Sequence, residues 1–295
     1  MKHIGIVANL NKPEAVEQTQ RIARLLARQG AKIYYEKDLA RVLGRPDSFE
    51  VGAPPSALKA LIVLGGDGTL IRTFRCLRER NLPLLGINLG GLGFLTELTL
   101  EDVPGALKQL LEGALITEHR ATLDCCLRRR GKVLGSYTAL NDVVIGKGGL
   151  ARVIHLEMFL DGQYLSGYIA DGLILATPTG STAYSLSAQG PIVSPETAAI
   201  LITPICPHTL TNRPLIVSDS RRAVVRLLKG PADTTLTVDG QVGVPLVVGD
   251  EMEVRKGAKS LVLLSPPQSS YFHILRSKLH WGGRSHYTRK ISWRA

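Results

Sequence analysis

The clearest indication of the fold in the first part of this chain is the sequence Ala60-Leu61-Ile62-Val63-Leu64-Gly65-Gly66-Asp67-Gly68-Thr69. Five apolar residues without alternation predict a strand that is buried on both faces, as in a parallel sheet. Glycines follow at once, and a helical pattern runs from Thr69 to Arg80. A glycine-rich turn at the start of a helix lets backbone N–H groups point toward an anion. The stretch therefore predicts a strand–turn–helix unit that binds phosphate.

Asp67 is the unusual residue of this turn. A carboxylate beside a phosphate is repulsive unless a cation bridges the two groups or the carboxylate acts as a base, and both uses suit phosphoryl transfer. The alternative is a tight turn stabilised by an Asx-type hydrogen bond. The chain contains no Walker A sequence, and no G-x-G-x-x-G follows its first strand. We therefore expect a phosphoryl-transfer site of another type.

Strand and helix patterns alternate on both sides of this stretch. Their β-α-β order predicts an α/β domain with an open parallel sheet over residues 1–118. The other predicted elements of this domain are strands at Lys2–Asn9, Ala31–Glu36 and Pro83–Ile87, helices at Pro13–Gln29 and Leu100–Leu111, and a loop rich in glycine and proline up to Pro55.

The pattern changes after residue 118. Residues 119–265 form short β-branched segments separated by turn signals such as Asp161-Gly162 and Asp239-Gly240, which predict an all-β, sandwich-like domain. The stretch Thr179–Gln189 departs from this pattern, because small residues and helix formers replace the β-branched ones. Residues 266–295 are predicted to be a basic segment that returns to the first domain, with a helix at Tyr271–Leu279.

The charge distribution bears on the partners of the chain. Of 295 residues, 36 are basic and 25 acidic, which gives a net charge of +11. Six of the cations lie in the C-terminal tail, at Arg276, Lys278, Arg284, Arg289, Lys290 and Arg294. We interpret the tail as an arm that packs on a neighbouring subunit, because Trp281 and Trp293 give it apolar area to bury. A nucleic-acid partner is the less favoured interpretation.

Membrane insertion and secretion are not expected from the sequence. No apolar run approaches the ~20 residues that cross a bilayer, and the apolar start of the chain is too short for a signal peptide. The four cysteines include no C-x-x-C pair, which favours a reducing compartment. We therefore expect a cytoplasmic protein without a membrane partner.

Several segments resemble one enzyme family. Gly65–Thr69 resembles the GGDGT signature of NAD kinases, diacylglycerol-type lipid kinases and phosphofructokinase relatives. Four later segments are similar to NAD kinases in the same order along the chain, namely Gly86–Thr96, Asn141-Asp142, Asp171–Pro191 and Pro204–Pro214. Because diacylglycerol kinases are not expected to carry the segment Asp171–Pro191, the chain most resembles the NAD kinase family. The resemblance covers roughly residues 3–275.

The resemblance implies an activity and a set of site residues. It implies that the γ-phosphoryl group of ATP is transferred to the 2′-hydroxyl of the adenosine ribose of NAD, with Asp67 as the general base. Mg²⁺ would be held mainly by the ATP phosphates, and a homodimer or homotetramer is expected. The residues expected to bind substrates are Gly66, Gly68, Arg72, Phe94, Asn141, Asp142, Arg152, Asp171, Thr179, Thr182, Ala183, Tyr184, Ser187 and Gln241.

Alternatives remain open at this stage. Asp142 stands where the family usually has Glu, and Gln189 where it usually has Gly. Asn141-Asp142 can also be a strand-end turn, and Phe94 a core residue. The chain as a whole can be a lipid or other alcohol kinase that uses the same loop, or a non-catalytic nucleotide-sensing protein that binds nucleic acid through its tail.

Overall fold

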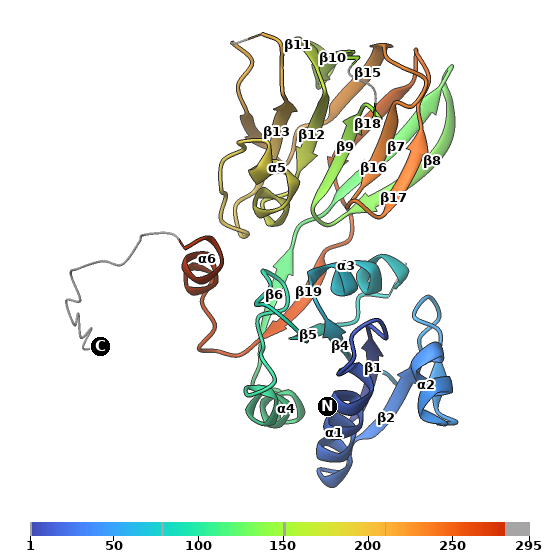
Figure 1. Ribbon diagram of the computed structural model, residues 1–295, viewed down its shortest axis with the longest axis vertical. Coiled ribbons are helices and arrows are strands. Elements are labelled where there is room, and N and C mark those ends of the chain that lie inside the picture. Colours follow the sequence, from blue (N-terminus) through green and yellow to red (C-terminus); the bar gives the residue numbers. More distant parts are fainter. Residues whose placement is uncertain (1, 78–79, 150–151, 210, 281–295) are drawn as a thin grey trace, which may run out of the picture.

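The computed structural model describes residues 2–77, 80–149, 152–209 and 211–280. Figure 1 shows an α/β domain, a β sandwich above it, and a C-terminal helix beside the junction between them. This arrangement confirms the predicted fold class. Within the described ranges, no helix is both long and apolar enough to cross a membrane.

The first domain is built on a seven-stranded sheet. Its strands are β1 His3–Ala8, β2 Lys32–Glu36, β3 Ser48–Phe49, β4 Ala60–Gly65, β5 Leu84–Asn88, β6 Ile116–Arg120 and β19 Leu261–Ser265, in the spatial order β3-β2-β1-β4-β5-β19-β6. Neighbouring strands from β3 to β19 pair in parallel, and β6 pairs antiparallel to β19. The predicted open parallel sheet is therefore present, with one antiparallel edge strand.

Helices cover both faces of this sheet. They are α1 Ala15–Arg28, α2 Lys37–Leu43, α3 Asp67–Cys76 and α4 Val103–Glu112. Ile62 and Leu64 of β4 pack against α1, α2 and α4 on one face, whereas Leu61 and Val63 pack against α3 on the other. This two-sided burial is the reason why β4 is a continuous apolar run. Helix α3 lies between the sheet and the sandwich (Figure 1).

The predicted loop up to Pro55 is wrong in its first part, because α2 begins directly after β2. The Glu36 side chain accepts a hydrogen bond from the Leu39 N–H at 3.1 Å, and Gly44 ends the helix with a φ of 62°. Seven residues give too few apolar positions for a clear helical period, so the caps and the burial of Leu39 and Ala40 form this helix.

The second domain consists of two six-stranded antiparallel sheets packed face to face. One sheet has the order β11-β10-β15-β18-β7-β8, formed by β7 Leu123–Arg129, β8 Lys132–Ala139, β10 Ile154–Leu160, β11 Gln163–Ala170, β15 Ala223–Lys229 and β18 Glu251–Lys256. The other has the order β14-β13-β12-β9-β16-β17, formed by β9 Asp142–Gly146, β12 Gly172–Ala176, β13 Ala199–Ile205, β14 Leu215–Ser218, β16 Thr235–Val238 and β17 Val242–Pro245.

The chain returns to the first domain earlier than the sequence indicates. Strand β19 was assigned with the β-rich part, but it pairs with β5 and β6 and all five of its residues are buried. Its apolar pattern does not reveal which sheet it joins. The predicted helix follows as α6, Tyr271–Leu279, which contacts the first domain through Phe94. Trp281, Trp293 and the cations Arg284, Arg289, Lys290 and Arg294 lie outside the described residues.

Candidate active site

The two glycine-rich loops meet because their strands are neighbours. In the parallel pairing of β4 and β5, Gly65 lies opposite Asn88, so both loops leave the sheet at the same edge. Helix α3 begins at Asp67, two residues before the predicted start, and Gly66 alone forms the turn. Asp67 is therefore the first residue of the helix, where the partial positive charge of the N-terminus favours an anionic side chain.

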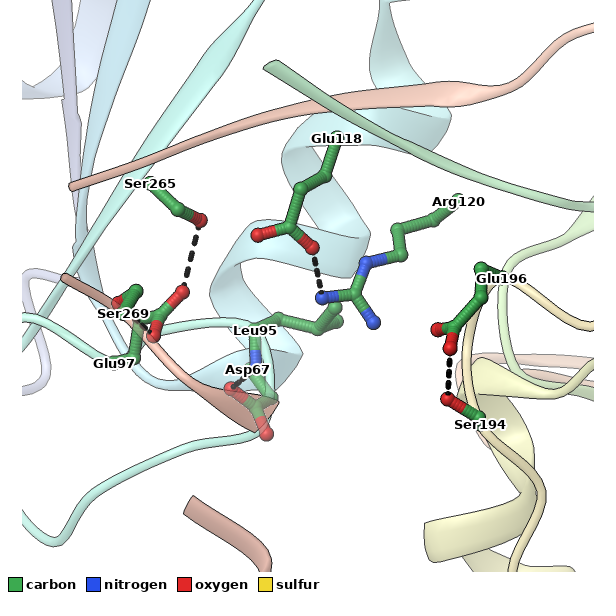
Figure 2. Close-up of polar contacts among 9 residues, drawn as sticks. All are labelled: Asp67, Leu95, Glu97, Glu118, Arg120, Ser194, Glu196, Ser265 and Ser269. Carbon is green, nitrogen blue, oxygen red and sulfur yellow. Dashed lines mark hydrogen bonds and ion pairs between the residues drawn. The ribbon is translucent and has the colours of Figure 1, made fainter. Parts of the chain in front are cut away.

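The Asp67 carboxylate holds the second loop in place. Its Oδ1 accepts hydrogen bonds from the N–H groups of Leu95 and Thr96 and from the Thr96 hydroxyl, each at 3.0 Å. Its Oδ2 accepts one from the Phe94 N–H at 2.8 Å. Figure 2 shows the contact with Leu95. A Cβ at Gly93 would lie 2.1 Å from Oδ1, so this approach requires glycine.

A cavity of about 530 Å³ adjoins the first loop. Gly66, Gly68 and Arg72, three of the residues expected to bind substrates, line it. Asn9 and Lys12 also line it, and sequence analysis missed both. They follow β1, which pairs with β4 so that Ala8 lies opposite Leu64. The available signal was the rule that ligands bind at the carboxyl ends of adjacent parallel strands.

A second cluster of the predicted residues forms around β9. The Asp239 carboxylate accepts hydrogen bonds from the N–H groups of Leu140, Asn141 and Asp142, at 3.0, 2.7 and 3.1 Å. Asp142 is only 4% exposed. Burial raises the pKa of Asp142 to about 7, and the nearby charge of Asp239 adds a smaller rise. A hydrogen bond from the Tyr184 backbone lowers this pKa in part. The sequence marked Asp239 only as a turn residue, so its bracing role was missed.

The predicted substrate loop packs on this cluster. It forms a short 3-10 helix, η1 Thr179–Thr182, and the four-residue helix α5, Tyr184–Ser187. The N–H of Thr177 donates to the Asn141 carbonyl at 2.9 Å, and a Cβ at Gly180 would lie 2.0 Å from that same oxygen. Close backbone contact therefore fixes Asn141 against the loop.

A smaller cavity of about 300 Å³ opens beside the loop. Asp171 and Tyr184 line it together with Gly146 and Lys147. Lys147 Nζ forms an ion pair with Asp171 Oδ1 at 2.8 Å, a partner that the sequence did not indicate. Tyr184 is 48% exposed, which leaves one side of its ring available to a ligand.

One hydrogen bond joins the two parts of the site. Gln241 Nε2 donates to the carbonyl oxygen of Gly68 at 2.9 Å. Gln241 follows Asp239 and Gly240, whose φ values of 52° and 62° form the tight turn between β16 and β17. The loop of Asp67 and the cluster of Asp142 are therefore connected through this turn.

Other predicted site residues lie less centrally. Phe94 packs on α6, with the Tyr271 ring centroid at 6.4 Å and Lys278 Nζ 5.0 Å from the centre of the Phe94 ring. Arg152 is exposed ahead of β10, and within the described chain no hydrogen bond or ion pair joins it to the other site residues. Thr179 is buried with its hydroxyl unpartnered in the described structure, whereas the Thr182 hydroxyl donates to the Thr179 carbonyl. Ser187 is exposed and Ala183 half-buried.

Arg120 is a further cation at the domain junction that the sequence did not single out. It is only 5% exposed, and its Nη2 lies 2.6 Å from Glu118 Oε2. Figure 2 shows Arg120 between Glu118 and Glu196 of the sandwich domain. Hydrogen bonds from Ser194 and the backbone lower the pKa of Glu196, and the positive charge of Arg120 lowers it further by a smaller amount.

Comparisons with known proteins identify the family of this chain. A model described as the ATP-NAD kinase N-terminal domain matches residues 4–115, and one described as the ATP-NAD kinase C-terminal domain matches residues 140–265. The NAD kinase of Syntrophotalea carbinolica is 45% identical over 285 residues, which cover 96% of this chain and all of that protein. The NAD kinase of Geobacter sulfurreducens is 44% identical over 284 residues, with the same coverage.

Two solved structures share the fold. Yeast NADH kinase complexed with NADH has a TM-score of 0.86 and 27% sequence identity to this protein. The match covers 98% of this chain and 90% of the yeast chain. An NAD kinase from Archaeoglobus fulgidus in complex with ATP has a TM-score of 0.75 at 24% identity, covering 94% and 98%. These findings favour NAD kinase over the lipid kinase and the non-catalytic sensor considered above. The chain therefore belongs to the NAD kinase family, and its activity is that of an NAD kinase.

Proposed function

We propose that this NAD kinase transfers the γ-phosphoryl group of ATP to the 2′-hydroxyl of the adenosine ribose of NAD, with Asp67 as the general base. The position of Asp67 is the observation that carries the proposal. It starts α3 beside the cavity of about 530 Å³, and Gln241 links its helix to the Asn141-Asp142 cluster. Within the described structure Oδ2 accepts a single hydrogen bond, so a lone pair remains there for a proton.

The cavity of about 530 Å³ is the proposed site for the ATP phosphates. Gly66 and Gly68 would present N–H groups at the start of α3, and the exposed Arg72 lines the same cavity with Lys12. Glu36 and Asp38 also line the cavity, but Glu36 caps α2 and Asp38 pairs with Arg41. Two cations and a helix N-terminus therefore remain to attract a triphosphate without any base contact. Sequence analysis included Arg72 and omitted Lys12, which we add to the proposed site.

The sandwich face is the proposed site for NAD. Asn141 and Asp142 would hold the ribose hydroxyls, and Tyr184 and Asp171 would contact the base at the cavity of about 300 Å³. A buried carboxyl beside Asp239 suits a sugar hydroxyl, because the protonated form can donate and the ionised form can accept a hydrogen bond. Thr179, Thr182, Ala183, Ser187, Arg152 and Phe94 remain proposed contacts at the periphery.

Mg²⁺ is proposed to enter with ATP rather than to occupy a protein cage. Among the described residues, no group of three or more His, Cys, Asp or Glu side chains is arranged to hold a metal ion. Asp67 Oδ1 already accepts three hydrogen bonds. Mg²⁺ commonly keeps waters and binds substrate phosphates with few protein ligands, and it would neutralise phosphate charge during transfer. The residues present fit that arrangement.

Assembly and location stay predictions from the sequence. A homodimer or homotetramer and a cytoplasmic location are expected, and no membrane or nucleic-acid partner is required by the proposed reaction. Gel filtration with light scattering measures the oligomeric state directly.

A direct assay tests the proposed reaction. The full chain is incubated with NAD, ATP and Mg²⁺, and the product is quantified with an NADP-specific dehydrogenase. Phosphorus NMR of the product distinguishes the 2′ from the 3′ ester. Parallel reactions replace ATP by polyphosphate or NAD by NADH, since the sequence leaves donor and acceptor strictness open. A phosphate found on any hydroxyl other than the 2′ contradicts the proposed chemistry.

A further inference from the structure

A cavity outside the proposed active site lies between the domains. It has a volume of about 230 Å³ and shares no lining residue with the two cavities described above. Phe74 and Arg75 of α3 line the cavity on the side of the first domain. On the side of the sandwich it is lined by Tyr137 of β8, Val238 of β16 and Val242 of β17, and Lys259 also lines it. The cavity therefore contacts both domains without overlapping the proposed substrate sites.

Two basic side chains, Arg75 and Lys259, line the cavity. Arg75 Nη1 is buried and has no hydrogen-bond partner among the described residues, where Arg75 also forms no ion pair within 4.0 Å. Lys259 Nζ lies 4.6 Å from the centre of the Phe74 ring, and burial lowers the pKa of Lys259. A buried donor without a partner costs free energy, so this arrangement favours an added acceptor at Arg75 Nη1.

The neighbouring acids are already engaged. Arg75 is close enough for its charge to help lower the pKa of Asp239, although burial raises that pKa overall. The Asp239 carboxylate accepts three backbone hydrogen bonds on the far side of the turn. The Asp124 carboxylate lies near Thr138 at the edge of the cavity. It accepts hydrogen bonds from the Thr138 hydroxyl and the Ala258 N–H. Neither carboxylate forms a hydrogen bond with Arg75.

We propose that this cavity binds a small organic carboxylate, which pairs with Arg75 and places its apolar part against Phe74, Val238 and Val242. The volume is below the ~300 Å³ at which drug-sized ligands begin to fit, so a nucleotide is too large. A guanidinium matches the two oxygens of a carboxylate. Inorganic phosphate has no apolar part to cover the valine side chains, so it fits this cavity less well.

A ligand in this cavity would contact both α3 and the strands on either side of the turn that carries Gln241. The hydrogen bond between Gln241 and Gly68 joins these same two parts of the structure. Arg75 lies on α3, which begins at Asp67, and Val238 and Val242 flank the turn that carries Gln241. A bound carboxylate therefore stabilises one position of the sandwich relative to α3, because it binds that position more tightly than others.

Calorimetric titration of the full chain with benzoate tests the proposal, with saturating NAD and ADP to occupy the proposed substrate sites. Benzoate is expected to bind saturably at one site per chain, and neutral benzamide and inorganic phosphate are expected not to compete. Arg75→Met is expected to weaken benzoate binding about tenfold or more. The matched control Arg24→Met removes an exposed arginine of α1 and should leave the affinity unchanged.

Three results would overturn the proposal: equal benzoate affinity in Arg75→Met and the unaltered chain, equal binding of benzamide, or no saturable binding in the millimolar range. If circular dichroism shows that Arg75→Met does not fold, Val242→Phe serves instead. Val242 is half-buried at the cavity wall, and a phenyl group there fills the space without removing a charge. Unchanged benzoate binding in that variant would equally exclude this cavity.

Discussion

Gln241 and Gly68, 173 residues apart, are joined by a hydrogen bond of 2.9 Å from the Gln241 side chain to the Gly68 carbonyl. Gly68 is the second residue of α3, and Asp67 is the first. The sandwich domain therefore holds the start of the helix that carries the proposed general base. Since orientation of reacting groups supplies much of the rate in such transfers, this bond is expected to act on catalysis.

Substitution of Gln241 is expected to slow the reaction. Gln241→Ala removes one hydrogen bond and should lower kcat/KM for NAD about fivefold. Gln241→Glu should cost more, because a carboxylate facing the Gly68 carbonyl has no proton to donate. Steady-state kinetics with both variants checks the order of the effects. Equal activity in Gln241→Ala, Gln241→Glu and the unaltered chain would contradict a role for this bond in positioning α3.

Asp67→Asn is expected to lower kcat by roughly 10²- to 10⁴-fold, the usual contribution of a positioned base. The amide keeps an oxygen for the N–H groups of Leu95 and Thr96, but its NH₂ group then faces the Phe94 N–H. Some loss of stability is therefore also expected. Kinetics and thermal melts on the same preparation separate the two effects.

Thr96→Val is the matched control for the anchoring role of the same carboxylate. It removes the hydroxyl that donates to Asp67 Oδ1 and accepts from Asn88, while Asp67 itself stays. We expect a loss of about 1–2 kcal/mol in the free energy of unfolding, with NADP formation within about tenfold of normal. If Thr96→Val loses as much activity as Asp67→Asn, then Asp67 acts as an anchor for the loop rather than as a base.

The raised pKa of Asp142 predicts a specific pH dependence of stability. The pKa in the folded state is about 7 and the ordinary pKa of an aspartate is 3.8, so the folded state binds more protons than the unfolded state between these pH values. The free energy of unfolding should therefore fall as pH rises from about 4 to 7, and level off above 7. Asp142→Asn should reduce this slope, although Asp239, whose pKa burial also raises, still contributes to it. The variant should raise stability at pH 8 by about 2 kcal/mol, below the ~4 kcal/mol of the full shift.

Denaturant melts from pH 4 to 8 on both proteins measure this effect. Asp239→Asn is not a suitable comparison, because that carboxylate braces three backbone N–H groups. Parallel pH profiles for Asp142→Asn and the unaltered chain would mean that Asp142 titrates near its ordinary value in the fold.

Gln189→Gly is expected to stabilise the protein. Gln189 follows α5 with a φ of 65°, which is unfavourable for a residue with a Cβ. Removing the Cβ should raise the free energy of unfolding by about 0.5–1 kcal/mol. Gln189→Ala keeps the strained backbone and should bring no gain. A melting temperature raised equally by both substitutions would place the cause elsewhere.

Sequence patterns predicted most of the first domain because its strands and long helices have a strong local signal. The strand at Ala60–Gly65 and the helix at Ala15–Arg28 lie close to their predicted bounds. The short helix Lys37–Leu43 was missed, since its ends depend on a side-chain cap and a left-handed glycine rather than on periodicity. Strand Leu261–Ser265 was predicted in the wrong sheet, because strand pairing is a long-range property.

The chemical character of the site can be predicted from the residues alone: a glycine turn with one carboxylate before a helix, a second glycine loop, and hydroxyl-rich segments downstream. These properties are local, because they follow from residue types and from a few backbone angles. Only the tertiary structure decided that Phe94, Leu95 and Thr96 bind Asp67, that Asp239 braces Asn141 and Asp142, and that Gln241 reaches Gly68. Each of those contacts joins residues 27 or more positions apart, so it depends on strand order and domain packing, which no local pattern encodes.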